Sequence, residues 1–235
     1  MVHGRRIGRA LAGAMKDVFL IYLGTWLYLG LAGLVLSLQI ALGGLYAIDI
    51  FVASASACLF VVLEYLSHRF FLHPCRIFGK VVNRRAVEAL HVNHHLRPVT
   101  RLYRTDEVAR GLAVFAGGIL PAAAIFAFFG HVLLAGRGGT AVAVLLLFSA
   151  FHEYVHRMAH LRYKSNHKWL NQLCRHHILH HYRDENHNFG MVTTIMDRLF
   201  GTFARNTSEM STSATRFSLG LSSSSPILSH KDRLN

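Results

Sequence analysis

The chain has 235 residues, of which 52% are hydrophobic and 16% are charged, a composition lean in charge for a soluble protein. Its formal net charge of +13 would suit nucleic-acid binding, but membrane proteins also concentrate Lys and Arg in cytoplasmic loops, so we expect no nucleic-acid partner. The three cysteines, Cys58, Cys75 and Cys174, lie far apart without a CxxC pair, which argues against a disulfide framework and a thiolate zinc site.

The first predicted element is a long apolar segment near the N-terminus. The 31 residues between Asp17 and Asp49 contain no charged side chain. A helix needs roughly 20 apolar residues to cross a bilayer, whereas the apolar part of a cleavable signal peptide is only about 7–15 residues long. We therefore expect a membrane-spanning helix within Val18–Tyr46.

Three further apolar segments follow, and they complete two helical hairpins. Gly43-Gly44 and the Gly-Arg-Gly-Gly run at 136–139 indicate the turns within the hairpins, and Pro121 predicts a kink in the third helix. We predict an all-α integral membrane protein with four transmembrane helices in two hairpins and a cytosolic, histidine-rich helical cap. The last three spans are Ala47–Leu66, Gly111–Phe129 and Gly138–Val155.

The basic residues predict the orientation of these helices. With the N-terminus inside, the outer turns contain only Arg137, and the other 24 of the 25 Lys and Arg residues lie on the cytoplasmic side. We expect a multi-pass protein of a bacterial inner membrane or an endoplasmic reticulum membrane. The membrane domain should cover residues 1–205, followed by a disordered Ser/Thr-rich tail at 206–235.

Histidines mark the candidate site. All 17 except His3, His131 and His230 fall in two clusters, residues 68–95 and 152–187, and each cluster follows an apolar hairpin. The clusters contain one HxxxxH, one HxxxH and two HxxHH motifs. Imidazole is a good ligand for iron and zinc, and ten imidazoles suit two metal ions. The predicted ligands are His68, His73, His91, His94, His95, His156, His160, His177, His180 and His181.

The spacing of the motifs decides which imidazoles can converge. Helix positions i, i+3 and i+4 share a face, so the three histidines of each HxxHH motif can face one centre, as can His156 and His160. His68 and His73 are about 140° apart on an α-helix, so they require a helix end or a break, which Pro74 can provide. An isolated HxxxH motif is a weak signal, but four motifs on one membrane face indicate metal binding.

Other residues near the motifs leave alternatives open. His152 extends the His156–His160 stripe, and His176 could replace His177, but we favour a role other than ligand for both, and for His167 and His187. Glu64 and Glu153 lie within about one turn of the motifs. They are candidates for acceptors that orient ligand imidazoles, or else charges at the level of the lipid headgroups.

The motifs resemble those of the fatty acid hydroxylase superfamily of membrane di-iron oxygenases, over about residues 60–203. Residues 64–73 (EYLSHRFFLH) and the HVNHH run at 91–95 resemble the first two boxes of fatty acid/sphingolipid 2-hydroxylases. HRMAH at 156–160 and HILHH at 177–181 resemble the third and fourth. Residues 188–190 and 197–202 resemble the closing signature, although Met196 stands where the family usually has Trp. On this resemblance alone, Asn188 and Asp197 become further residues that orient the ligands.

The resemblance implies an activity and its requirements. We expect an O2-dependent di-iron monooxygenase that hydroxylates an acyl chain of a fatty acid or sphingolipid, with two iron ions that zinc can replace on purification. The sequence lacks the His-Pro-Gly-Gly haem signature of some relatives, so electrons should come from a separate cytochrome- or ferredoxin-type protein. Alternatives are a sterol or carotenoid hydroxylase or desaturase of the same superfamily, and a metal transporter. A transporter would need ionisable residues inside the membrane, which the first and third predicted helices lack.

Overall fold

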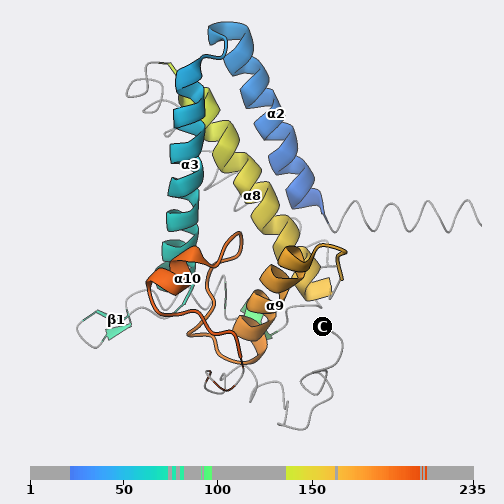
Figure 1. Ribbon diagram of the computed structural model, residues 1–235, viewed down its shortest axis with the longest axis vertical. Helices are drawn as coiled ribbons and strands as arrows, with labels where there is room; N and C mark the ends of the chain where they lie inside the picture. Colours follow the sequence, from blue (N-terminus) through green and yellow to red (C-terminus); the bar gives the residue numbers. More distant parts are fainter. Residues whose placement is uncertain are drawn as a thin grey trace, which may run out of the picture. The chain divides into compact units, whose positions relative to one another are not determined.

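The computed structural model describes residues 22–73, 76–77, 80–81, 91, 93–96, 136–161, 164–206, 208 and 210. Three long helices lie within these ranges: α2 (Leu23–Gly43), α3 (Ala47–Leu66) and α8 (Gly138–Leu161) (Figure 1). Each is long and apolar enough to cross a membrane, and the second span continues to Leu72. The predicted span Gly111–Phe129 and most of the predicted tail lie outside the described residues.

The all-α prediction is confirmed for the described residues except for one very short ladder. Strand β1 (Arg76–Ile77) pairs antiparallel with β2 (Lys80–Val81), with Arg76 opposite Val81. The bounds of the helices differ from the expected ones at two places. Helix α2 ends at Gly43, before Gly44 with its positive φ of 64°, and α8 continues six residues beyond Val155 through the HxxxH motif.

The chain divides into two compact units. The first unit contains residues 1–57 and 100–157, and therefore α2, the start of α3 and most of α8. Small residues allow α2 and α8 to approach closely, and Ala32, Val142 and Leu146 form their common core. Large apolar side chains such as Leu38 and Leu42 are 50% and 86% exposed, as expected of a helix that faces lipid.

A buried polar cluster fixes the α2–α3 turn to the start of α8. The Asp49 carboxylate accepts hydrogen bonds from Thr140 Oγ1 at 2.5 Å and from the Tyr46 amide at 2.8 Å, and Arg137 lies at 3.3 Å. The Arg137 guanidinium also donates to the carbonyls of Gly43 and Gly44. These carbonyls end α2 and would otherwise lack hydrogen-bond donors at the helix terminus.

The second unit contains residues 58–99 and 158–235. Its helices are the end of α3, the π-helix η1 (Ser67–Leu72), α5 (Asn93–Leu96), the end of α8, α9 (Lys168–Tyr182) and α10 (Ile195–Leu199). Tyr65, Phe189 and Met196 form a buried core, which packs the segment after α9 and α10 against the end of α3.

The first prediction concerns the close contact of α2 with α8. A Cβ atom on Gly139 would lie 2.9 Å from Gln39 Cβ and 2.6 Å from Gln39 Oε1, whereas a Cβ atom on Gly30 would meet nothing within 4 Å. Gly139→Ala should therefore lower the melting midpoint of the purified protein by several degrees, because overpacking typically costs about 1–3 kcal/mol. Gly30→Ala, the matched control, should leave it unchanged or raise it, because alanine favours helix by about 1 kcal/mol. Equal effects of the two changes would contradict this packing.

Candidate metal centre

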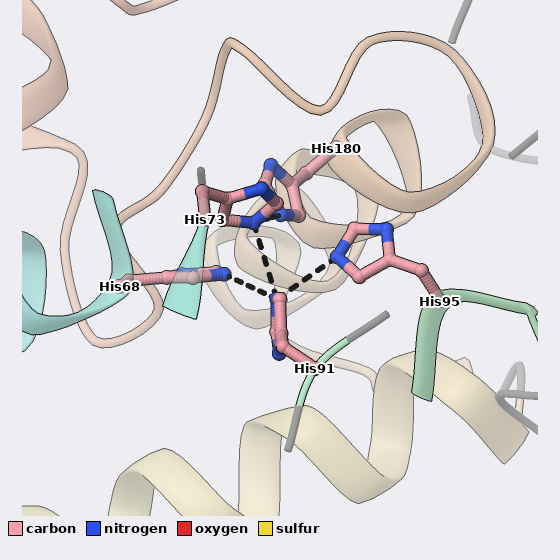
Figure 2. A group of neighbouring side chains, drawn as sticks. All are labelled: His68, His73, His91, His95 and His180. Carbon is pink, nitrogen blue, oxygen red and sulfur yellow. Dashed lines mark hydrogen bonds between the residues drawn. The ribbon is translucent and has the colours of Figure 1, made fainter. Parts of the chain in front are cut away.

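The structure gathers five histidines of the second unit into one group. Within the group, one ring nitrogen of each residue lies within 4.8 Å of those of the others. Figure 2 shows the rings pointing toward a common point from η1, from the segment around 91–95 and from α9. All five side chains are buried. The members are His68, His73, His91, His95 and His180.

The π-helix solves the spacing problem of the first motif. A π-helix forms i→i+5 hydrogen bonds and has more residues per turn, so residues five apart lie closer to one face than they do on an α-helix. Helix α3 changes to η1 at Ser67, and η1 ends at Leu72, where His73 adopts extended backbone angles. His68 and His73 therefore reach the same group, and their ring centroids lie 5.2 Å apart. The sequence predicted a break or a helix end, and the structure contains both.

A second histidine group adjoins the first. Its members in the second unit are His94, His160, His177 and His181, each with a ring nitrogen within 4.8 Å of the others. His156 lies one turn before His160 on α8, on the same stripe of that helix. The two groups are neighbours, because the rings of His95 and His181 stack with centroids 4.0 Å apart.

Two backbone carbonyls determine which ring nitrogens of the first group are unprotonated. His68 Nδ1 lies 2.6 Å from the Phe189 carbonyl oxygen, and His180 Nδ1 lies 2.7 Å from that of His187. A carbonyl oxygen can only accept, so both Nδ1 atoms donate a proton, and in a neutral ring Nε2 then carries a lone pair. The Nε2 atoms of His68 and His180 thus present lone pairs to the interior of the group.

These lone pairs meet other ring nitrogens at short distances. His91 Nε2 lies 3.2 Å from His68 Nε2, 3.1 Å from His73 Nε2 and 2.9 Å from His95 Nε2 (Figure 2). In the second group, the Nε2 atoms of His160 and His177 are 3.1 Å apart. Two imidazole nitrogens bound at right angles to one ion, each at about 2.1 Å, would be about 3.0 Å apart. The nitrogen spacing therefore fits ligands of a common metal ion.

His181 supports the same conclusion for the second group. It is fully buried, and neither of its ring nitrogens has a hydrogen-bond partner in the described structure. A buried polar atom without a partner costs free energy, and such an atom in a native protein often marks a bound ion. The donor set, entirely imidazole, suits iron or zinc. The residues of both groups thus fit metal ions.

Burial keeps these rings neutral, which is the form that binds metal. It lowers the pKa of His73 to about 2, with a smaller contribution from the neighbouring His68. Burial, followed by the charge of surrounding imidazoles, also holds the pKa of four further rings well below the ordinary value. These are His91, His95, His180 and His181.

The Asp197 carboxylate organises the segment that provides the Phe189 carbonyl. It accepts hydrogen bonds from the amides of Phe189 and Gly190, each at 2.8 Å, from Thr202 Oγ1 at 2.8 Å and from His176 Nε2 at 3.0 Å. Burial alone would raise the pKa of Asp197, but His176, the Gly190 amide and Thr202 together lower it below its ordinary value. Asp197 therefore acts on His68 through one peptide unit.

Asn188 and Glu64 fix the same segment from two other sides. Asn188 has a positive φ of 62° and is fully buried, and its amide group exchanges two hydrogen bonds with the backbone of Ala204. Glu64 Oε2, on the last turns of α3, accepts from the amides of Met191 and Val192, each at 3.2 Å. Asn188 lies between His187 and Phe189, whose carbonyls orient His180 and His68, and Glu64 holds the two amides that follow Gly190.

Glu153 lies in the first unit. Its Oε1 atom accepts from Arg157 Nε at 2.6 Å, one turn along α8, and its side chain packs against Gly24 of α2. His152, in the same unit, lies 6.2 Å from His156 between ring centroids. His167 is exposed just before α9.

Comparison with known families bears on the identity of this site. The family model for fatty acid hydroxylase matches residues 53–202, which is more than half of the chain. The chain belongs to the fatty acid hydroxylase family. Members of this family are oxygen-dependent hydroxylases, so the chain is broadly a lipid oxygenase of the hydroxylase type. Comparisons with curated proteins and with solved structures found no match.

The sequence did not predict two backbone carbonyls and one side chain of the hydroxylase that orient the histidine ligands directly or through Asp197. The carbonyls of Phe189 and His187 carry no signal in their side chains, so no residue pattern could assign them. In the sequence, His176 is a possible replacement for His177 in the fourth motif, but in the structure it is buried and hydrogen-bonded to Asp197. Its place in the sequence, one residue before His177, turns it onto a different face of α9.

A second prediction follows from the depressed pKa values of the buried rings. In the unfolded chain these histidines have pKa values near 6.5, so below about pH 6.5 the unfolded state binds protons that the folded metal-free hydroxylase excludes. The melting midpoint of metal-free protein should therefore fall progressively between about pH 7.5 and 5. Thermal unfolding in detergent after chelation measures this. A midpoint that is constant across that range would show that the rings are already accessible to protons.

Proposed function

We propose that the chain is a di-iron monooxygenase that hydroxylates an acyl chain of a fatty acid or sphingolipid. The observation that supports this most directly is the pair of adjacent, all-histidine groups with converging ring nitrogens, at the end of helices apolar enough to cross a membrane. The ten ligands would be the nine histidines gathered in the second unit and His156 on the preceding turn of α8.

Iron, when bound, supplies the oxidising chemistry that an unactivated C–H bond requires and that acid–base side chains cannot provide. The chain's own residues hold and orient the ions. The Phe189 and His187 carbonyls fix the rings of His68 and His180, so that their Nε2 lone pairs face inward. Burial of the rings excludes water, which strengthens every electrostatic interaction within the site.

The apolar surroundings support a lipid as substrate. The ligands begin two residues after Leu66, where α3 has completed the roughly 20 residues needed to cross a bilayer. An acyl chain can approach from between the helices without leaving an apolar environment. A sterol or carotenoid substrate is the second candidate, and the product distinguishes the two.

We place the histidine groups on the cytoplasmic side, where a separate cytochrome- or ferredoxin-type protein would deliver electrons. The one-sided distribution of Lys and Arg supports this orientation. The membrane would be a bacterial inner membrane or that of the endoplasmic reticulum.

The third prediction tests the activity and the metals together. Lipids of cells that express the chain should contain acyl chains heavier by one oxygen atom, as measured by mass spectrometry. His180→Ala and His94→Ala should each abolish this product and lower the iron content, because ligands of one centre fail as a unit. His167→Ala, a change at an exposed histidine of the same region, is the matched control and should retain both.

Three outcomes would contradict parts of the proposal. Oxygen added to a sterol or carotenoid, with unchanged acyl chains, would be consistent with the proposed oxygenase activity but would contradict the proposed acyl-chain substrate. Fewer than about one and a half ions in fully active protein would overturn the two-metal centre. Full activity of His180→Ala would overturn the site itself.

The fourth prediction concerns orientation. Single cysteines placed beside Arg137 and beside Arg97, in a background without the natural cysteines, should react with a membrane-impermeant reagent from opposite sides. The Arg97 position should react only after the cytoplasmic face is opened. Labelling of both positions from one side would refute the proposed topology.

A further inference from the structure

The second unit contains a basic pocket that the histidine groups do not use. The cavity has a volume of about 400 Å³ and is lined in part by Arg175, Arg198 and Arg205. All three arginines are exposed. Buried His176 and half-buried Phe203 also line the pocket, and their rings stack with centroids 5.6 Å apart.

Helix α9 separates this pocket from the histidine groups by presenting a different face to each. Gln172, Arg175, His176 and Leu179 follow the i, i+3, i+4, i+7 pattern of one helical face, and all four line the pocket. The neighbouring stripe contains His177, His180 and His181. The pocket is therefore distinct from the candidate metal centre although it shares a helix with it.

The lining suits an anion with several oxygen atoms. Arg guanidinium groups bind phosphate through paired, charge-assisted hydrogen bonds. Arg198 is held in place by stacking over Phe203, with its Cζ atom 3.9 Å from the ring centroid, and by a hydrogen bond from its Nε to Thr194 Oγ1. The acidic neighbour of the pocket, Asp197, is fully buried and directs its carboxylate to His176, Thr202 and two backbone amides.

The other side of α10 indicates where the anion comes from. Ile195, Leu199 and Phe200 are 57%, 73% and 52% exposed, which is unusual for three apolar residues within six positions. The Phe200 ring stacks on Tyr65 of α3, with centroids 5.2 Å apart (Figure 1 shows α10 beside that end of α3). Tyr65 is the nineteenth residue of a 20-residue apolar helix, so it lies at the boundary of the bilayer core.

We propose that this pocket binds the phosphate-bearing headgroup of an anionic membrane lipid. Ile195, Leu199 and Phe200 enter the boundary between headgroups and acyl chains, as the apolar side of an interfacial helix does, and the arginine side chains then stand at headgroup level. A free phosphate ion would use the arginines but gain nothing from the apolar residues. An acidic protein would have to displace the headgroups around α10.

The test measures thermal stability of the purified full chain in mixed micelles that contain phosphatidylglycerol or, separately, phosphatidylcholine. A ligand that binds only the folded state raises the melting midpoint, so phosphatidylglycerol should raise it by roughly 5 °C relative to phosphatidylcholine. Arg175→Gln/Arg205→Gln should lose most of this difference. Lys164→Gln/Lys168→Gln removes two exposed cations beside and on α9, and should retain it.

The outcomes separate the lipid from other anions and from charge in general. Equal loss of the shift in both double variants would overturn the pocket, because net charge alone would then explain it. A shift of the same size with inorganic phosphate in phosphatidylcholine micelles would overturn the lipid as the source. Arg175→Lys/Arg205→Lys, which keeps the charge and the fold but not the paired geometry, should show a reduced shift; a full shift would overturn the bidentate contact.

Discussion

The convergence of unprotonated imidazole nitrogens in a buried site is the constraint on which the rest of the second unit depends. His68 and His180 each donate a hydrogen bond from Nδ1 to a backbone carbonyl, which leaves Nε2 lone pairs that face other ring nitrogens at 3.2 and 3.0 Å. Two lone pairs at such distances repel unless a proton or a metal cation lies between them. The arrangement therefore depends on carbonyls at fixed positions and on rings held neutral by burial, and its converging nitrogens suit a metal ion.

The fixed carbonyls explain why the segment after α9 contains so many buried polar side chains. Asp197 holds the amides at 189 and 190, Asn188 is tied to Ala204, and Glu64 reaches the amides at 191 and 192. Each of these would be costly to bury without its partners. Gly190 is required within this segment, because a Cβ atom there would collide with the Thr193 carbonyl and lie 2.9 Å from Asp197 Oδ2.

The sequence predicted the parts of the site that side-chain spacing encodes. The mainly apolar run Ala47–Leu66 was predicted with the bounds that the helix has. The HxxHH motif at 177–181 lies on α9, but its rings do not face one centre as expected: His180 joins the first histidine group, and His177 and His181 join the second. The π-helix could not be predicted, because its signature is the hydrogen-bond pattern of Ser67–Leu72 and no residue type there demands it. The carbonyls of Phe189 and His187 were missed for the same reason. The pocket at Arg175 and Arg205 joins α9 to residues thirty positions later, a contact that only folding creates.

The position of the π-helix follows from the membrane. Within a bilayer core, a change of hydrogen-bond register exposes carbonyl and amide groups that lipid cannot satisfy. Ala47–Leu66 provides the roughly 20 residues that a crossing needs, and the change occurs at Ser67, immediately beyond. There the irregular turn is covered by protein, since His68 is only 5% exposed and contacts the Phe189 carbonyl. The change of helical period that brings His68 and His73 into one group therefore follows the roughly 20 residues that a crossing needs, at the end of the apolar segment.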